Sequence, residues 1–474
     1  MARISQMRVV SLLFLCAGLA GCRTHTLLGG SSGSGNSSVV LAMTDSPPSL
    51  VTILSAKVTL TGATLMPGNV SVFSGSTTIE LTKLQTDIAY ITTAASVPPG
   101  SYTSVTLTFA NPMLTIENDT TSTIGTCAAA SICTMAPTSV LHLSTTVPLT
   151  GFTTVAGASA GLLVDVSLDN LLDSAMAADF QAGTAVSAFT PAGSGVPPVG
   201  AEDVVGQVSS VNASSNTFTL QNVTASYSMK VDSASTFFQF LSTVCITAGF
   251  SCLQNNQIVS VDIGIQADGS IVARNIVFED SDNSDTEVEG IITNTNAASQ
   301  EFSIVTLAES AAVPNLSIGD PATVQYAVAP PTLFEADFAH VDNSPVSTGG
   351  FLFAAPTDLA IGQEVSIRRN AAGSSGISGN VIIKADRIRL RSTRITSSIV
   401  SNNFPIINLS VPSIFSGHGI NNIQAQSQQA ICSDPSENVI LCAHVLQNLS
   451  VSARGPLFNV SGARSMITTR VVEK

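Results

Sequence analysis

Tryptophan is absent from this sequence, and aromatic residues make up only 5% of its 474 positions. Sugar-binding platforms depend on exposed aromatic rings, so this scarcity argues against a carbohydrate-binding module. Charged residues reach only 11%, unlike the charge-rich composition of disordered chains. Beyond the N-terminal segment, no apolar run is long enough to cross a bilayer as a helix.

Basic residues are also few. Lysine and arginine total 18 against 32 aspartate and glutamate residues, a formal net charge of −14. Residues 1–21 hold two arginines and no acid, so the remainder carries 16 − 32 = −16. Because an acidic chain repels phosphate backbones, we expect no nucleic-acid partner. Serine, threonine, asparagine and glycine abound instead, which suits an exported β protein with hydroxyl groups on its solvent faces.

Recognisable catalytic motifs are missing as well. No Gly-x-Ser-x-Gly elbow lies in a strand-to-helix context, and no glycine-rich phosphate loop precedes a helix. Asp45 and Asp165 are candidates for acid–base chemistry, but Asp45 precedes a Ser-Pro-Pro turn that a carboxylate would stabilise. Nothing in the sequence brings the two together. We therefore expect no enzyme activity and no cofactor, with an unrecognised hydrolase as an alternative.

The N-terminus has the pattern of an export signal. Two arginines precede an apolar stretch, residues 9–19, that is too short to span a bilayer. The next residues complete the run Leu-Ala-Gly-Cys, which resembles the lipobox of bacterial lipoproteins. The resemblance implies cleavage after residue 21 and lipid attachment to Cys22. An ordinary signal peptide with a chance cysteine is the alternative.

The residues after Cys22 favour the anchored reading. Residues 22–36 are rich in glycine and serine and form a flexible tether, which suits a chain fixed at its start. Arg23 stands where aspartate would favour retention in the inner membrane. We expect a cell-envelope protein, lipid-anchored in the outer membrane and facing the periplasm or the surface.

Six cysteines remain once Cys16 leaves with the signal and Cys22 carries lipid. They allow many pairings, but their close spacing favours three local disulfides, each closing a short loop. A metal site is the alternative, although the spacings are not those of zinc ligands. The favoured pairs are Cys127 with Cys133, Cys245 with Cys252, and Cys432 with Cys442.

Residues 37–182 contain many short segments in which apolar and polar residues alternate. Val105, Leu107 and Phe109 alternate with small polar residues after a Pro-Pro-Gly-Ser-Tyr turn. Such segments, separated by turn signals, predict a β-sandwich. The Thr-Asp-Ser-Pro motif at residue 44 and the Pro-Gly-Ser-Tyr motif at residue 99 resemble the lipoprotein family called domain of unknown function 4382. That resemblance implies an immunoglobulin- or transthyretin-like sandwich.

A linker rich in proline, glycine and small residues is expected over residues 183–203. After it, the chain repeats itself. The first two copies match without a gap from Gly206 to Leu220 and from Gly290 to Ile304, each reading as a strand, a turn and a strand. Later matches align Thr236 with Thr332 and Ala273 with Ala385. A third, weaker copy begins at about residue 394.

The copies resemble the family called domain of unknown function 5666, which implies small β-barrels. The expected fold is therefore all-β, a sandwich followed by three barrel-like repeats with separate cores. Two of the repeats are expected to carry a matching disulfide, and loss of one disulfide should loosen only its own module. The repeats are expected over residues 204–280, 288–392 and, in divergent form, 394–474.

An acidic run occupies residues 279–287, with Glu289 just beyond. Alternating oxygen ligands can bind calcium, which makes Asp280, Asp282 and Asp285 weak candidates for a metal site. The run lacks the glycine and the closing glutamate of a calcium loop, and it lies between two repeats. A solvated linker is the favoured interpretation.

These observations predict a lipid-anchored cell-envelope protein that displays β modules in a non-catalytic binding or scaffolding role. A carbohydrate-binding surface lipoprotein is the second alternative, beside the hydrolase. The expected partners are the membrane, through the N-terminal lipid, and an envelope protein or a glycan.

Overall fold

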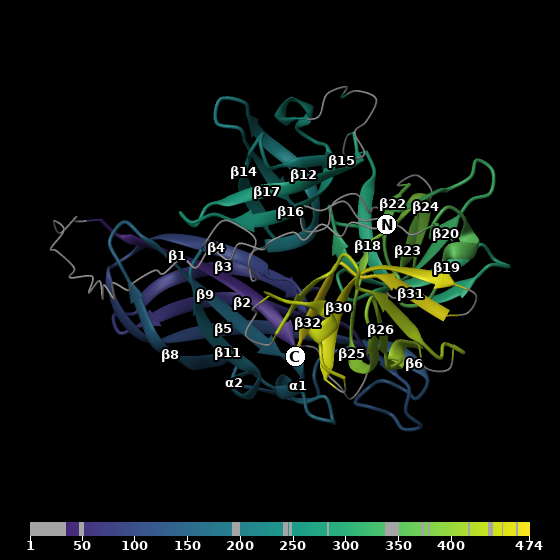
Figure 1. Cartoon of the computed structure of the whole chain (residues 1–474), viewed down its shortest axis with the longest axis horizontal. Coiled ribbons are helices and arrows are strands. Elements are labelled where there is room, and N and C mark those ends of the chain that lie inside the picture. The colour runs from purple at the N-terminus through teal and green to yellow at the C-terminus, as the bar shows by residue number, and fades with distance from the viewer. Residues whose placement is uncertain are drawn as a thin grey trace, which may run out of the picture. The chain divides into compact units, whose positions relative to one another are not determined.

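The computed structural model describes residues 35–46, 52–191, 200–239, 245, 249–281, 284–336, 350–370, 374–377, 380–415, 418–434, 439–447, 449–460 and 463–474 (Figure 1). The predicted signal segment, Cys22 and Asp282 lie outside these residues. The described chain is almost entirely β-strand, which confirms the all-β fold. None of its helices is long and apolar enough to span a membrane.

Two sheets form the N-terminal sandwich, in the strand orders β11-β9-β1-β4 and β3-β2-β5-β6, with β8 also paired to β5. Alternation of apolar and polar residues along the strands lets each sheet bury one face. In β5, for example, Val105, Leu107 and Phe109 all point into the core. The strands are β1 Ser37–Ser46, β2 Thr52–Met66, β3 Val70–Glu80, β4 Ala89–Val97, β5 Gly100–Asn118, β6 Ser131–Met135, β8 Ser144–Thr154, β9 Ser159–Ser167 and β11 Thr184–Phe189.

Short elements complete this module. They are a 3₁₀ turn at Leu81–Leu84, β7 Val140–Leu141, α1 Leu168–Leu171, β10 Ala178–Asp179 and α2 Phe180–Gly183. Strand β11 pairs antiparallel with β9, with Val186 opposite Val164. The sandwich therefore continues to Phe189, and the linker expected over 183–203 is shorter, since β12 already begins at Gly200.

Barrel 1 closes through the ring of pairings β12-β13-β14-β17-β16-β12, in which only β14 and β17 run parallel. This order defines a five-stranded barrel with the connectivity of the OB fold. A short extra strand, β15, pairs with β17. The strands are β12 Gly200–Asn212, β13 Thr217–Gln221, β14 Ser226–Val231, β15 Phe237–Gln239, β16 Ile258–Ile265 and β17 Ile271–Asp280.

Barrel 2 repeats the ring as β18-β19-β20-β24-β22-β18. Strand β21 takes the place of β15 beside the last strand, and β23 forms an additional pair with β24. The strands are β18 Thr286–Asn296, β19 Glu301–Glu309, β20 Pro321–Tyr326, β21 Leu333–Ala336, β22 Glu364–Arg369, β23 Ser375–Ile377 and β24 Asn380–Leu390.

Barrel 3 makes the same circuit, β25-β26-β27-β31-β30-β25, with the last strand split into β31 and β32. Strand β28 pairs parallel with β32, as β15 does with β17. The strands are β25 Ser392–Asn403, β26 Ile406–Leu409, β27 Ile423–Gln426, β28 Ile431–Ser433, β29 Val439–Ile440, β30 Ser450–Val460, β31 Ala463–Ile467 and β32 Arg470–Glu473. 3₁₀ turns lie at Phe250–Cys252, Pro356–Asp358, Ser413–Phe415 and Cys442–His444.

The sequence matches between the first two copies have a structural basis. A Cβ atom on Gly206 would lie 2.7 Å from the carbonyl oxygen of the neighbouring strand, and a Cβ on Gly290 would lie equally close. Only glycine permits this approach. Thr236 donates its hydroxyl hydrogen bond to a carbonyl of the last strand, and Thr332 donates the equivalent one. The repeated residues thus perform repeated structural tasks.

The expectation of separate cores is wrong. Val40 of β1 packs in the barrel 1 core, and Leu54 of β2 packs in the barrel 3 core. Phe458 and Ile467 of barrel 3 belong to the core cluster of barrel 2. Barrels of this size bury too little apolar surface alone, so neighbouring modules complete one another's cores. Loss of one disulfide is therefore expected to affect more than its own module.

Candidate functional site

The structure joins Cys127 to Cys133, Cys245 to Cys252 and Cys432 to Cys442, the three local pairs that spacing favours. Cys252 and Cys442 each belong to a 3₁₀ turn ahead of an equivalent strand, β16 or β30. The bridges hold loops in place. They also indicate an oxidising, extracytoplasmic compartment.

The acidic run is not a solvated linker at its two ends. Glu279 is the penultimate residue of β17, while Glu287 and Glu289 lie in β18, and all three side chains are buried. That interpretation was wrong because each carboxylate meets a basic partner from a distant strand. Arg387 lies 2.7 Å from Glu279 and 3.2 Å from Glu287.

Asp280 and Asp285, the described calcium candidates, share another partner. The Nε atom of Arg368 lies 3.0 Å from a carboxylate oxygen of Asp280 and 3.3 Å from one of Asp285. A guanidinium group therefore occupies the space between them. Within the described ranges, no group of three potential ligands could hold a metal ion.

The buried acids belong to a continuous set of ion pairs, here named the junction network. Glu279 is one hub, since it contacts Arg387, Arg389 and Arg391. Asp87 is another, 2.7 Å from Arg394. Pairs no longer than 4.0 Å link the members without a break: Lys83, Asp87, Glu202, Asp203, Glu279, Glu287, Glu289, Glu335, Glu364, Arg387, Arg389, Arg391, Arg394, Arg454 and Arg470.

This network joins all four modules. Lys83 of the sandwich lies 2.7 Å from Glu289 of barrel 2, and Arg454 of barrel 3 lies 3.0 Å from Asp203 of barrel 1. Burial opposes the charged form of Glu279, but its arginine partners outweigh burial and lower its pKa to about 2. The network therefore holds ionised groups where unpaired charge would be costly.

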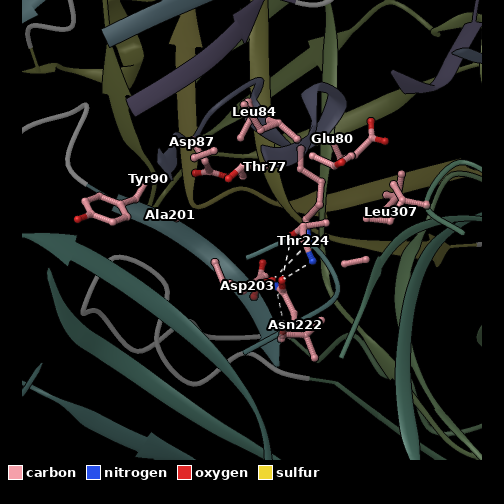
Figure 2. A pocket seen from close by; sticks show the side chains of 18 of the residues that line it. Thr77, Glu80, Leu84, Asp87, Tyr90, Ala201, Asp203, Asn222, Thr224 and Leu307 are labelled. Atoms are coloured by element: carbon pink, nitrogen blue, oxygen red, sulfur yellow. Dashed lines mark hydrogen bonds between the residues drawn. The ribbon is translucent and has the colours of Figure 1, made fainter. Parts of the chain in front are cut away.

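A pocket lies beside the network where the sandwich, barrel 1 and barrel 2 meet, here named the junction pocket (Figure 2). It encloses about 740 Å³ of space free of protein atoms, including the solvent space of its open mouth. Leu84 and Ile88 line the sandwich side, Val205 the barrel 1 side and Leu307 the barrel 2 side.

Two of the four tyrosines line this pocket. The rings of Tyr90 on β4 and Tyr227 on β14 have centroids 6.4 Å apart. The Tyr90 hydroxyl hydrogen-bonds with Thr93, whereas that of Tyr227 makes no hydrogen bond within the described chain. Burial, followed by the nearby Tyr90, raises the pKa of Tyr227 to about 12. The phenol therefore remains protonated and able to donate.

Five carboxylates line the pocket, and four of them are already held. Glu80 accepts hydrogen bonds from Ser55 and from backbone amides, while Asp87, Glu202 and Asp203 pair with arginines of the junction network. Glu309 on β19 is the exception.

Glu309 is 3% exposed and makes no ion pair within the described residues. One carboxylate oxygen accepts a hydrogen bond from the Val313 amide at 3.3 Å, and Oε1 has no partner there. Burial and, after it, the charge of Asp320 raise its pKa to about 7, against a lowering effect of Lys57. The Lys57 ammonium donates instead to the Ile318 carbonyl. Glu309 is thus a buried carboxyl group without a counter-ion.

Glu309→Gln is expected to remove a pH dependence of stability. The folded chain keeps the Glu309 proton up to about pH 7 and the unfolded chain loses it near 4.5, so stability falls as pH rises through this window. The ionisation cost at high pH is about 3 kcal/mol. Urea unfolding should therefore show that glutamine stabilises the protein at about pH 8 relative to wild type, and much less at about pH 4.

Glu301→Gln, on the same strand, measures the effect of the substitution itself. An equal stability difference between Glu309→Gln and wild type at both pH values would contradict the assignment.

Asp45 and Asp165 are brought close together, which the sequence did not indicate. They lie on the paired parallel strands β1 and β9, and burial raises the pKa of each. Asp45 is fully buried, and its Oδ1 accepts a hydrogen bond from the Leu168 amide at the start of α1. This contact is structural, but it joins Asp45 to α1, whereas the two prolines of the Ser-Pro-Pro turn that the sequence pointed to lie outside the described residues.

Comparisons with known proteins add little. No family model matches the chain, and no curated protein matches it. A crystal structure described as a multidomain protein with nucleic acid binding domains, from Streptococcus pneumoniae TIGR4, is similar over 56% of this chain and 71% of its own. Sequence identity is 10% and the TM-score is 0.11, so this likeness carries no argument for a shared function.

The match nevertheless corrects one prediction. The expected absence of a nucleic-acid partner is contradicted by the description of this structure, although the likeness assigns no such binding to the present chain. The exclusion relied on net charge, which describes the whole chain and not one binding surface. Barrels with this connectivity also bind oligonucleotides in other proteins.

Proposed function

We propose that this chain is a lipid-anchored cell-envelope protein with a non-catalytic binding role, and that the junction pocket is its ligand site. The observation that carries the proposal is the composition of the pocket walls. Three modules contribute to one partly apolar cavity, and a buried network of ion pairs joins the same modules. Such a pocket at a module interface is typical of ligand sites.

Two further features support this role. The residues that line the pocket include no histidine, serine or cysteine, so the usual nucleophile and base pairs are not available there. The disulfides agree with export, and the Leu-Ala-Gly-Cys motif at residues 19–22 supports an anchor at Cys22. Arg23 after this cysteine favours the outer membrane.

A fragment screen by thermal shift on the full chain tests this function. Ala308 lines the pocket on β19, and Ala308→Phe should fill part of it. We expect fragments that raise the melting temperature of wild type but not of Ala308→Phe, and that are recovered chemically unchanged. Val155→Phe, at an exposed position on the sandwich, is the matched control. A screen without pocket-dependent fragments, or conversion of the bound fragment, would reject the proposal.

A further inference from the structure

The junction pocket contains one buried acid, Glu309, that forms no ion pair within the described residues, although Lys57 acts on it from a distance. Four of its five carboxylates are held by arginines or by several hydrogen bonds, and only Glu309 is left with a single weak contact. An ionised carboxylate in this position is unfavourable unless a cation reaches it. A cation that reached Glu309 would therefore stabilise the ionised form of its carboxyl group.

No basic group among the described residues forms an ion pair with Glu309. Lys57, the basic group that acts on Glu309, donates to the Ile318 carbonyl, and Lys83 is shared by Glu289 and Glu364. Asp320 adds further negative charge beside Glu309. The field at this end of the pocket thus favours a positively charged ligand from outside.

The other walls suit an organic cation more than a metal ion. The described residues contain no cluster of three metal ligands. Leu84, Ile88 and Leu307 offer apolar surface, and Tyr90 with Tyr227 offers two aromatic faces. Apolar and aromatic walls favour an alkyl or aryl body, and aromatic faces also attract ammonium groups.

We propose that the junction pocket binds a small organic amine, whose ammonium group pairs with Glu309 while its apolar body lies against Leu84, Ile88 and Leu307. This inference rests on the proposed function, because it names the ligand class of the same pocket. Ammonium and carboxylate must both be ionised, so binding strengthens as Glu309 loses its proton.

Isothermal titration of the full chain with benzylamine, and with benzyl alcohol as its neutral counterpart, tests the proposal. With a pKa of about 7 for Glu309, benzylamine affinity should rise about 30-fold between about pH 5.5 and about pH 8. At the higher pH, benzyl alcohol should bind more weakly than benzylamine, and its affinity should not rise with pH. Glu309→Gln should abolish both the preference for the amine and its pH dependence.

Glu117→Gln is the matched control. Burial, followed by the charge of Asp119, also raises the pKa of Glu117 to about 7, but this residue lies on β5 and does not line the pocket. It should leave amine binding unchanged. If Glu309→Gln folds poorly, the test remains decisive through two other measurements. These are the pH profile of wild type and the loss of amine binding expected in Ala308→Phe.

The outcomes separate the two proposals. Equal binding of amine and alcohol, or an amine affinity independent of pH, would overturn the cation assignment and leave the pocket as a ligand site. Binding that persists in Ala308→Phe would place the ligand elsewhere and overturn both. No binding of either probe, together with a negative fragment screen, would also overturn both.

Discussion

Glu279→Gln is expected to destabilise the folded protein by about 3–5 kcal/mol, the usual cost of removing one partner from a buried ion pair. The carboxylate of Glu279 is buried and contacts Arg387 at 2.7 Å and Arg389 at 2.5 Å, with Arg391 on its other oxygen. Glutamine keeps the shape but removes the charge, which leaves guanidinium groups in a buried site with too little compensation. Urea or thermal unfolding measures the loss.

The pH dependence gives a second readout of the same group. The pKa of Glu279 in the folded chain is about 2, below that of the unfolded chain, so its contribution to stability is present above about pH 4.5 and is lost as pH falls toward 2. Glu279→Gln should reduce this loss in the acid range. The stability difference between Glu279→Gln and wild type should therefore shrink as pH falls. For Glu309→Gln, the stability difference should grow as pH rises.

Asp268→Asn is the control for an exposed ion pair. Asp268 lies 3.9 Å from Lys230, and both side chains are more than half exposed. Solvent screens such a pair, so the change should cost well under 1 kcal/mol. If Glu279→Gln were as mild as this control, the junction network would not be a stabilising element of the fold.

The network explains why sequence reasoning misread the acidic run. Glu279 and Arg387 are 108 positions apart, and no local pattern connects them. A run of acids between two repeats usually lies in solvent, and burial here depends on arginines from another strand. A signal was present, however. Arg387, Arg389 and Arg391 recur at every second residue, which on a β-strand places three guanidinium groups on one face.

The barrels were more predictable because their pattern is local. Gly206 and Gly290 occur at the same place in gapless copies, and the structure shows the same close backbone approach at both. Thr236 and Thr332 behave in the same way. By contrast, the shared cores could not be predicted, since Val40 and Leu54 read as ordinary inward residues of the sandwich. Alternation shows that a residue is buried but does not identify the module that covers it.

The candidate site could not be predicted from the sequence repeat or from the alternation of apolar and polar residues. Glu309 and Tyr227 come from different repeats, and each is unremarkable in its own strand. Their significance arises only from the fold, which places both on one pocket beside residues of the sandwich. The resemblances to domain of unknown function 4382 and domain of unknown function 5666 stay predictions, because no family model matches the chain.

Cys22→Ser is expected to move nearly all of the protein from the detergent phase to the aqueous phase in Triton X-114 partitioning. In a bacterial host that processes lipoproteins, wild type should carry acyl chains on Cys22, and stable anchoring follows from more than one chain. Without the thiol, no thioether can form, and the remaining chain offers no helix in its described part that could span a membrane. Mass spectrometry of the N-terminal peptide should show the lipid on wild type alone.

The chain provides a matched control for this experiment. Cys16 lies in the apolar stretch that the lipobox reading assigns to the removed signal, so Cys16→Ser should partition as wild type does. Exposed apolar residues such as Leu352 and Leu441 are present in every variant, and detergent binding at those positions would retain all three proteins equally. A Cys22→Ser protein that stays in the detergent phase would therefore reject the anchor, and with it the envelope location that the proposed function assumes.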